Sequence, residues 1–442
     1  MSHVFPRSLA QAIPVAVRAA GAWVEDADGN RYLDGAGGAI VVSIGHGDPD
    51  VARAIAEQAA RLAYVHGTAF TTPSLEDYAA DLAPLLPVDD PRVYPVSGGS
   101  EAVETALKLA RSYHLARGDG NRHVVVSRWG SYHGNTRGAL DASGREPLRA
   151  PYEPWLGQGV HVPAVYEYRC HLPDHPEGCG PEHAAILERV IRDIGPDRVA
   201  AFIAEPVGGA TLGAVVPPEG YWPAVAEVCR RHGVLLIADE VMTGFGRTGR
   251  WFGLDHWDVR PDILTAGKGA SSGYWPLGLA VASGQVFETV REGGFVHGLT
   301  YSHHAVGAAA GHAVLRRLRD DGLVERSRDV GERLLKELTE ALAGSPIVGD
   351  VRGLGLMLGV ELVADRGTRS PFPRGERITE RVLAAAKEEG LLLYPSTGCA
   401  DGDDGDLVML GPPFTISEDE AGLLVERTAA AIDAVAREVA EA

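Results

Sequence analysis

Four short apolar runs that alternate with helix-like segments constrain this 442-residue chain most strongly. They cover residues 123–127, 199–205, 234–239 and 277–283. Runs this short and apolar are typical of strands buried on both faces, and helices between successive strands allow those strands to pair in parallel. The sequence therefore predicts an α/β fold with a mostly parallel central sheet and helices on both of its faces.

The chain changes character near residue 322. Beyond that point we expect three helices and a glycine-rich strand, which together predict a smaller α+β domain. The helices are expected at residues 323–342, 376–389 and 418–439, and the strand at residues 351–361.

Near the start of the chain, residues 21–34 have the pattern of two strands around an Asp28-Gly29 turn. Such a hairpin could pair with the C-terminal part of the chain. We therefore divide the chain into an N-terminal segment that joins the small domain (1–50), a large cofactor-binding domain (51–322) and a C-terminal small domain (323–442).

The composition limits the possible partners. The formal net charge of −19 opposes binding to nucleic acid and to anionic membranes, because the phosphate groups of both would repel the surface. No apolar run approaches the roughly 20 residues that cross a bilayer, and the first residues lack the layout of a signal peptide. Four cysteines in so long a chain form no disulfide framework. We expect a cytoplasmic protein with reduced thiols.

Three chemically active side chains follow predicted strands. Glu205 and Asp239 each end an apolar run, and Lys268 comes 29 residues after Asp239, just beyond another short run. Open α/β sheets bind ligands at the carboxyl edge of their strands. A lysine amine can form a Schiff base with an aldehyde cofactor, and a carboxylate can keep a pyridine nitrogen protonated. The pair predicts a site for pyridoxal 5'-phosphate.

The other parts of such a site are also present. Gly98, Gly99 and Ser100 directly precede a helical stretch, whose free N–H groups and dipole favour a phosphate. Tyr132 offers an aromatic ring that could stack on the cofactor. Each of these features is common when it occurs alone, and their order along one chain is what favours the cofactor site.

Taken in order, eight segments resemble those of the class III aminotransferases, a family of fold-type I pyridoxal phosphate enzymes, over nearly the whole chain. The segments are Gly45-His46-Gly47-Asp48-Pro49, residues 97–111, Tyr132-His133-Gly134, Ala204-Glu205-Pro206-Val207, residues 238–249, Gly267-Lys268-Gly269 with residues 273–278, residues 297–303, and residues 351–361.

The resemblance implies a role for each matching residue. Lys268 would bind the cofactor and act as the catalytic base, and Asp239 would pair with the pyridinium nitrogen. Tyr132 would stack on one face of the ring, and Val241 would pack against the other. The remaining implied cofactor-site residues are Gly98, Gly99, Ser100, His133, Glu205 and Thr300.

The resemblance also implies the reaction and the assembly. The reaction would be a ping-pong amino transfer in which the cofactor alternates between its pyridoxal and pyridoxamine forms. Thr300 would reach the phosphate of the neighbouring subunit, which implies a homodimer with active sites at the interface, with a tetramer as the alternative. The partners would be a small amine donor and a keto acid acceptor.

Two departures from the family bear on the substrate. Family members that accept dicarboxylates or amino acids commonly carry an arginine at one of two C-terminal positions, where this chain has Tyr394 and Met409. In the ornithine-type members the second arginine pairs with the glutamate that matches Glu205. We therefore expect Glu205 to attract a donor ammonium group, so that the donor is an amine, ω-amino acid, diamine or amino sugar and the acceptor a keto acid such as pyruvate.

A third departure concerns the loop near the phosphate. His303 stands where the family usually has glycine.

Three alternatives differ from this hypothesis. A non-transaminating enzyme of the same fold, such as a decarboxylase, racemase or aminomutase, would share the Schiff base and the electron sink. The glycines of residues 244–249 match a dinucleotide-binding pattern, but the acidic pair precedes them and no glycine-loop helix follows, so we reject that interpretation.

The third alternative, a zinc-stabilised binding protein, comes from residues 170–183. This segment contains Cys170, His171, His175, Cys179 and His183. Its spacing matches no C-x₂-C framework, and a loop rich in proline and glycine can collect such residues by chance. We assign no metal ligands from the sequence, which leaves open whether this segment binds a metal.

Overall fold

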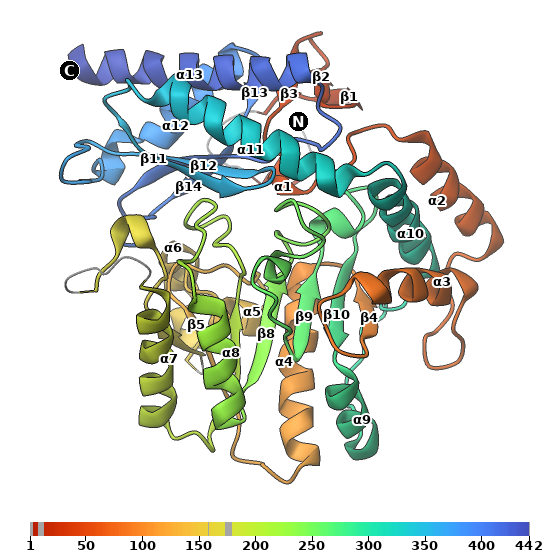
Figure 1. The fold of residues 1–442 in the computed structure, drawn as a ribbon. Helices are drawn as coiled ribbons and strands as arrows, with labels where there is room; N and C mark the ends of the chain where they lie inside the picture. Colours follow the sequence, from red (N-terminus) through yellow and green to blue (C-terminus); the bar gives the residue numbers. More distant parts are fainter. Residues whose placement is uncertain (1–2, 8–12, 158, 173–178, 442) are drawn as a thin grey trace.

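A computed structural model describes residues 3–7, 13–157, 159–172 and 179–441 (Figure 1). Its largest sheet has seven strands in the order β4-β10-β9-β8-β7-β5-β6. Strand β10 runs antiparallel to both neighbours, while β9, β8, β7, β5 and β6 are parallel. The strands are β4 (Arg92–Val96), β5 (Val124–Arg128), β6 (Gly159–Val162), β7 (Val199–Ala204), β8 (Leu235–Glu240), β9 (Ile263–Ala266) and β10 (Gly278–Ala282). The predicted α/β class with a mostly parallel sheet is confirmed.

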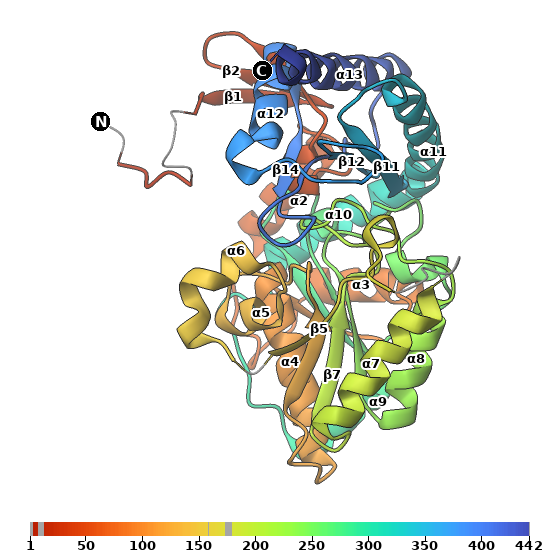
Figure 2. The same cartoon turned by 90° about the vertical axis from the view of Figure 1, so that its left-hand side faces the viewer.

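Helices cover both faces of this sheet (Figure 2). One face packs against α7 (Gly180–Ile194) and α8 (Tyr221–His232), and the other against α4 (Gly99–Ala116), α5 (Arg137–Ala142) and α9 (Gly284–Gly293). Successive side chains of β8 alternate between the two, because Leu236 joins the α7 and α8 core and Ile237 the α4 core. Burial on both faces explains why these strands are continuous apolar runs.

A second sheet, in the order β11-β12-β15-β14, lies at the carboxyl edge of the first and above it in Figure 1. Helices α11, α12 and α13 pack around it. The bounds are β11 (Val348–Leu354), β12 (Met357–Leu362), β14 (Tyr394–Thr397), β15 (Asp406–Leu410), α11 (Leu323–Leu342), α12 (Ile378–Glu388) and α13 (Glu418–Glu441).

The prediction of one strand over residues 351–361 is wrong, because the chain folds back as the β11–β12 hairpin. Gly355 occupies the turn with φ +54°, and a Cβ there would lie 2.4 Å from the carbonyl carbon of Thr248. The glycines of this segment therefore allow a turn and a close backbone approach.

The N-terminal hairpin forms as β2 (Trp23–Asp26) and β3 (Arg31–Asp34). With β1 (Ala16–Ala20) it makes a sheet whose fourth strand is β13 (Leu391–Leu392), paired in parallel with β3. Residues from the two ends of the chain therefore share one sheet.

The remaining helices flank these sheets. They are α1 (Gly37–Ile40), α2 (Pro49–Arg61), α3 (Pro73–Leu82), α6 (Glu146–Arg149) and α10 (Ala305–Asp320), of which α2 and α3 pack against α10. None of the helices in the described ranges combines the length and apolar character needed to span a membrane.

One buried cation holds three distant segments together beside the carboxyl edge. Arg247 donates hydrogen bonds to the carbonyl oxygens of Val42, Leu356 and Pro412 at 2.8–3.0 Å. Its guanidinium also lies 4.6 Å from the centre of the Phe414 ring. Since these contacts satisfy a buried charge only when all three segments are in place, they fix the N-terminal and C-terminal walls around the edge of the large sheet.

Candidate active site

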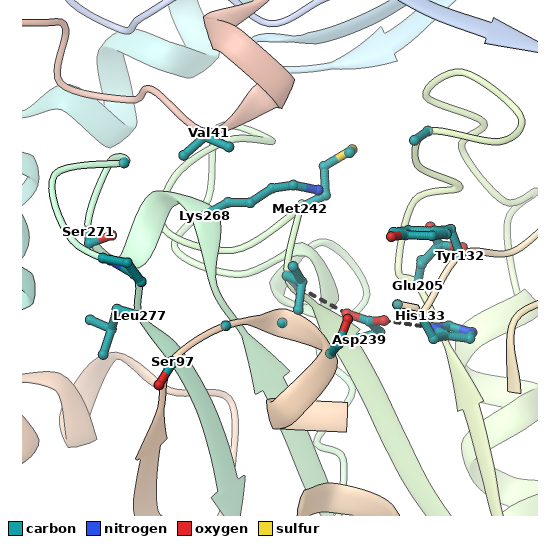
Figure 3. Close-up of a pocket in the computed structure, with 18 of the residues that line it drawn as sticks. Val41, Ser97, Tyr132, His133, Glu205, Asp239, Met242, Lys268, Ser271 and Leu277 are labelled. Carbon is teal, nitrogen blue, oxygen red and sulfur yellow. Dashed lines mark hydrogen bonds and ion pairs between the residues drawn. The ribbon is translucent and has the colours of Figure 1, made fainter. Parts of the chain in front are cut away.

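A cavity of about 400 Å³ lies at the carboxyl ends of β7, β8 and β9 (Figure 3). Five separate stretches of the chain bring nine predicted residues to its lining. These are Gly98, Gly99, Ser100, Tyr132, His133, Glu205, Asp239, Val241 and Lys268.

Asp239 lies on the floor of the cavity and is 3% exposed. Its carboxylate is 2.6 Å from Nδ1 of His133 and accepts hydrogen bonds from Val241 N and from Thr265 Oγ1 at 3.1 and 3.2 Å. His133 is also buried, and its backbone N–H donates a hydrogen bond to Ser143 Oγ at 2.8 Å. A carboxylate with this many donors is fixed in position, as a partner for a cationic ring nitrogen must be.

Lys268 directly follows β9 and extends into the cavity (Figure 3). Burial lowers the pKa of its amine to about 8, although Asp239 and Glu205 act in the opposite direction. The residue has φ +40°, a left-handed conformation that costs energy for a side chain other than glycine. An amine with a lowered pKa is both a better nucleophile and a better proton acceptor near neutral pH.

The phosphate cradle is the N-terminus of α4, with Gly98 as its N-cap. A Cβ on Gly99 would lie 2.9 Å from Val241 Cγ1, and a Cβ on Gly134 would lie 2.3 Å from Ser100 Oγ. Glycine at these two positions therefore lets Val241 and Ser100 pack closely against the backbone of the cradle. The free N–H groups of the first helical turn and the Ser100 hydroxyl are suitable donors to a phosphate.

Tyr132 completes this half of the cavity with a ring that faces its interior (Figure 3). A reactive amine, a fixed carboxylate, an anion cradle and an aromatic wall surround one space. These groups fit pyridoxal 5'-phosphate, since each matches a different part of that cofactor.

Glu205 is the second buried carboxylate of the cavity, at 6% exposed. It accepts one hydrogen bond from Gly209 N at 3.1 Å, and burial raises its pKa. Within the described ranges, no arginine or lysine forms an ion pair with it.

Met409 and Tyr394 lie on neighbouring strands of the second sheet, paired in register. Met409 is fully buried in an apolar cluster with Ala210 and Met242, both of which line the cavity. A methionine thus packs behind the side of the cavity that carries Glu205.

Arg145 is a residue that the sequence did not single out. It precedes α6, is half-buried, and its Nε is buried with no hydrogen-bond partner among the described residues. Burial lowers its pKa, while Tyr394 and Tyr132 act in the opposite direction. The residue lines a second cavity together with Trp129 and Thr211, not the cavity that Lys268 lines. A lone loop arginine belongs to no motif, and only its burial beside Tyr132 marks it.

Thr300 is the one predicted site residue that does not line this cavity, and it is exposed. It lies in the loop that contains His303, which has φ +60° and so adopts the left-handed conformation usual for glycine. The His303 ring contacts Tyr94 at 4.6 Å between centroids. His303 thus adopts a conformation that glycine would adopt at lower cost.

Aromatic side chains surround this loop. His304 lies 5.3 Å from Trp275, which lines the cavity, and 6.2 and 6.3 Å from Tyr64 and Tyr301. The rings of Tyr64 and Tyr301 lie 6.4 Å apart, and the two residues are 40% and 63% exposed. An exposed apolar surface, which we call the Thr300 patch, is thus connected to the cavity.

Known proteins that resemble this chain are aminotransferases. A family model described as "Aminotransferase class-III" matches residues 4–432. An uncharacterised aminotransferase of Bacillus subtilis, YodT, is 41% identical over 98% of both chains.

Solved structures agree in fold and in length. An (S)-enantioselective omega-transaminase from Thermomicrobium roseum is 40% identical with a TM-score of 0.91, covering 98% of this chain and 96% of its own. An amine transaminase from an uncultivated Pseudomonas species, solved in its PLP-bound form, is 37% identical with a TM-score of 0.91 over 98% of both chains.

Proposed function

Because this chain belongs to the class III aminotransferases, which depend on pyridoxal 5'-phosphate, we propose that it transfers an amino group from an amine-bearing donor to a keto acid such as pyruvate. The observation that carries this choice of donor is Glu205, a buried carboxylate in the cavity with no ion-pair partner in the described ranges. The donor class includes amines, ω-amino acids, diamines and amino sugars.

Each cavity residue then has a task. The first turn of α4 and Ser100 bind the phosphate, Asp239 holds the ring nitrogen as a cation, and Tyr132 and Val241 enclose the ring. His133 positions Asp239 through its 2.6 Å contact. When bound, the cofactor supplies an electron sink that stabilises negative charge on the carbon bearing the amino group.

Lys268 has two tasks in turn. Its amine would hold the cofactor by the aldehyde group and so keep it in the cavity. The free Lys268 Nζ then takes the proton that leaves the donor carbon. A pKa of about 8 suits both tasks, because the amine can lose and regain a proton near neutral pH.

The donor is selected by charge. His133 and Arg128 favour the charged form of Glu205 without forming an ion pair with it among the described residues. A buried carboxylate without a direct ion pair is costly, and an ammonium group on the donor would supply that pair. Met409 offers no charge on this side of the cavity, so a second carboxylate on the substrate has no partner there. This difference favours cationic donors over dicarboxylates.

The acceptor needs one cation, and in this proposal Arg145 supplies it from a second cavity that the residue lines. Its guanidinium has a buried Nε without a partner in the described ranges and lies near Tyr132, the ring beside the reacting centre. A guanidinium binds a single carboxylate well. A keto acid with one carboxylate, such as pyruvate, therefore matches the charges available.

The active unit in this proposal is a homodimer. Thr300 of one subunit reaches the phosphate site of the other, and the exposed Thr300 patch supplies the apolar contact surface. Sedimentation velocity is expected to give twice the chain mass. A monomer that retains full activity would refute this assembly.

The visible spectrum of the purified enzyme tests the donor class. Amines and amino acids are added one at a time without a keto acid, and the cofactor band should bleach with monoamines, diamines or amino sugars more readily than with glutamate. Bleaching by glutamate alone would overturn the argument from Glu205. Absence of a cofactor band after supplying pyridoxal phosphate would remove the enzyme proposal itself.

A further inference from the structure

A compact cluster of metal-binding side chains lies apart from the cavity residues. Cys170 follows a short 3₁₀ turn (Glu167–Arg169), and Cys179 and His183 lie at the start of α7. Their potential ligand atoms all lie within 4.8 Å of one another. The cluster therefore joins a loop to a helix across eight intervening residues, of which 173–178 lie outside the described ranges, as does His175 of the predicted segment.

The distances in the cluster match those of a tetrahedral zinc site. With Zn–S near 2.3 Å and Zn–N near 2.0–2.1 Å, tetrahedral angles place two thiolate sulfurs about 3.8 Å apart and a sulfur and an imidazole nitrogen about 3.6 Å apart. The observed separations are 3.9 Å between Cys170 Sγ and Cys179 Sγ and 3.5 Å between Cys170 Sγ and His183 Nε2. Two of the three separations among these ligand atoms thus have the lengths expected of a zinc site, and the third is no more than 4.8 Å.

The positions of the three ligands also suit a metal. Cys179 is the N-cap of α7 and His183 comes four residues later, so both side chains lie on one face of the helix. Cys179 is fully buried and His183 is 4% exposed, while Cys170 is half-buried. Burial of polar ligand atoms this close together is typical of sites that a cation completes.

We propose that Cys170, Cys179 and His183 bind a structural Zn²⁺ ion. The fourth position is open to His171, whose ring lies 5.3 Å from that of His183 between centroids, or to water. Two thiolates and an imidazole are ligands that favour zinc over magnesium or calcium. Each thiol gives up its proton on binding, and no electron is transferred.

The ion would stabilise a junction between α7, which packs on the seven-stranded sheet, and the β11-β12-β15-β14 sheet. Arg169, the residue before Cys170, pairs with the buried Glu361 of β12 at 2.6 Å. Its guanidinium also donates to the carbonyl oxygen of Arg369 at 2.8 Å. A metal bond at Cys170 fixes the backbone that presents Arg169, and so anchors this loop between α7 and the second sheet.

The competing outcome is a disulfide. The observed Sγ–Sγ separation of 3.9 Å is well beyond the roughly 2.05 Å of a covalent bond. Cys170 and Cys179 are nevertheless near enough for an oxidant to join them. The experiment must therefore report metal content and thiol state separately.

The test uses the full-length enzyme, purified without a polyhistidine tag, stripped with a chelator and reloaded with zinc chloride. Elemental analysis after gel filtration should find one zinc per chain, and Cys179→Ala should reduce it below about 0.2. Cys229→Ala is the matched control, because Cys229 is a buried cysteine outside the cluster and should leave the stoichiometry at one.

Two further measurements keep the proposal falsifiable if Cys179→Ala folds poorly. Cobalt loading of the wild-type enzyme should produce a thiolate-to-cobalt absorption band in the difference spectrum, and zinc should raise the midpoint of thermal unfolding by a few degrees, about 2–4 °C. Four alkylatable thiols with no zinc uptake would overturn the proposal, and so would a Cys170–Cys179 disulfide found by mass spectrometry. None of these measurements depends on transaminase activity. The zinc proposal can therefore be refuted while the proposed function stands, and the reverse is also true.

Discussion

The floor of the cavity and its substrate side each hold one buried carboxylate, and their surroundings differ. On the floor, Asp239 contacts His133, Val241 N and Thr265. On the substrate side, Glu205 receives a single backbone hydrogen bond, and burial raises its pKa. A carboxylate with several donors is ready for a permanent cation, whereas one with few partners is ready for a cation that arrives and leaves. The comparison thus separates cofactor binding from substrate choice.

The largest effect should come from removing the floor's reactive amine. Lys268→Ala is expected to lower kcat by at least about 10³-fold, because the residue acts both as nucleophile and as base. The cofactor's visible band should also change in position. Lys336→Ala is the matched control, since Lys336 is a surface lysine with a side chain 74% exposed and should retain full activity. Near-normal turnover by Lys268→Ala would refute its assignment.

The next effect tests the floor carboxylate. Asp239→Asn keeps the shape but removes the charge that holds the ring nitrogen protonated, and kcat should fall by about 10²- to 10³-fold. His133→Gln, which removes a positioning contact, should lower kcat less and leave the KM for the donor nearly unchanged. If the two variants were equally impaired, the contact between His133 and Asp239 would matter as much as the charge of Asp239.

The acceptor cation is tested on the substrate side. Arg145→Met should raise the KM for pyruvate by about tenfold, the worth of one charge-assisted hydrogen bond, with little change for the donor half-reaction. Stopped-flow measurement of each half-reaction separates the two. Arg145→Lys should recover part of the loss, because it restores the charge without the planar fork. An equal loss in both half-reactions would mean that Arg145 serves the structure of the loop.

Most residues of the cavity floor could be predicted from the sequence because the geometry of a parallel sheet determines where the ends of its strands lie. Residues that end adjacent strands meet at one edge, so Glu205, Asp239 and Lys268 could be brought together from their positions alone. The glycines of the cradle could be predicted for a similar reason, since a helix N-terminus that binds an anion needs an open backbone.

Other features depend on the path of a loop, which the sequence does not give even where, as in residues 170–183, it shows the candidate side chains. Arg145 comes near Tyr132 and Tyr394 only through the path of its loop, and Cys170 meets His183 only when that loop closes on α7. The turn at Gly355 was missed because an apolar, glycine-rich run suits either one strand or a tight hairpin. The domain boundaries proposed from the sequence stay a prediction.

The lowered pKa of Lys268 gives a pH test of the floor. The amine reacts with the cofactor aldehyde only when neutral, so a pKa of about 8 makes the rate of cofactor uptake by apoenzyme rise with pH and level off above about pH 9. Between pH 7 and 8.5 the expected increase is about eightfold, from the neutral fraction of an amine with that pKa. N-acetyl-lysine, measured in parallel, corrects for titration of the cofactor. A rate that continues to rise to pH 10 would contradict the lowered pKa.

The smallest effect concerns Glu205 and decides between donors. Glu205→Gln should reduce kcat/KM for a diamine about three- to fivefold relative to a monoamine of equal length, because water in the open cavity screens the lost charge pair.

The raised pKa of Glu205 also predicts the direction in which the donor preference changes with pH. Glu205 loses its charge at a higher pH than an exposed glutamate, so the preference for diamines should fall on mild acidification in the wild type and stay flat in Glu205→Gln.

Met409→Arg is the converse change, since a guanidinium on this side should pair with Glu205 and improve the use of glutamate. If Met409→Arg left glutamate a poor donor while Glu205→Gln left diamines unaffected, the substrate side would be selecting by shape, and the contrast between the two carboxylates would hold for the cofactor alone.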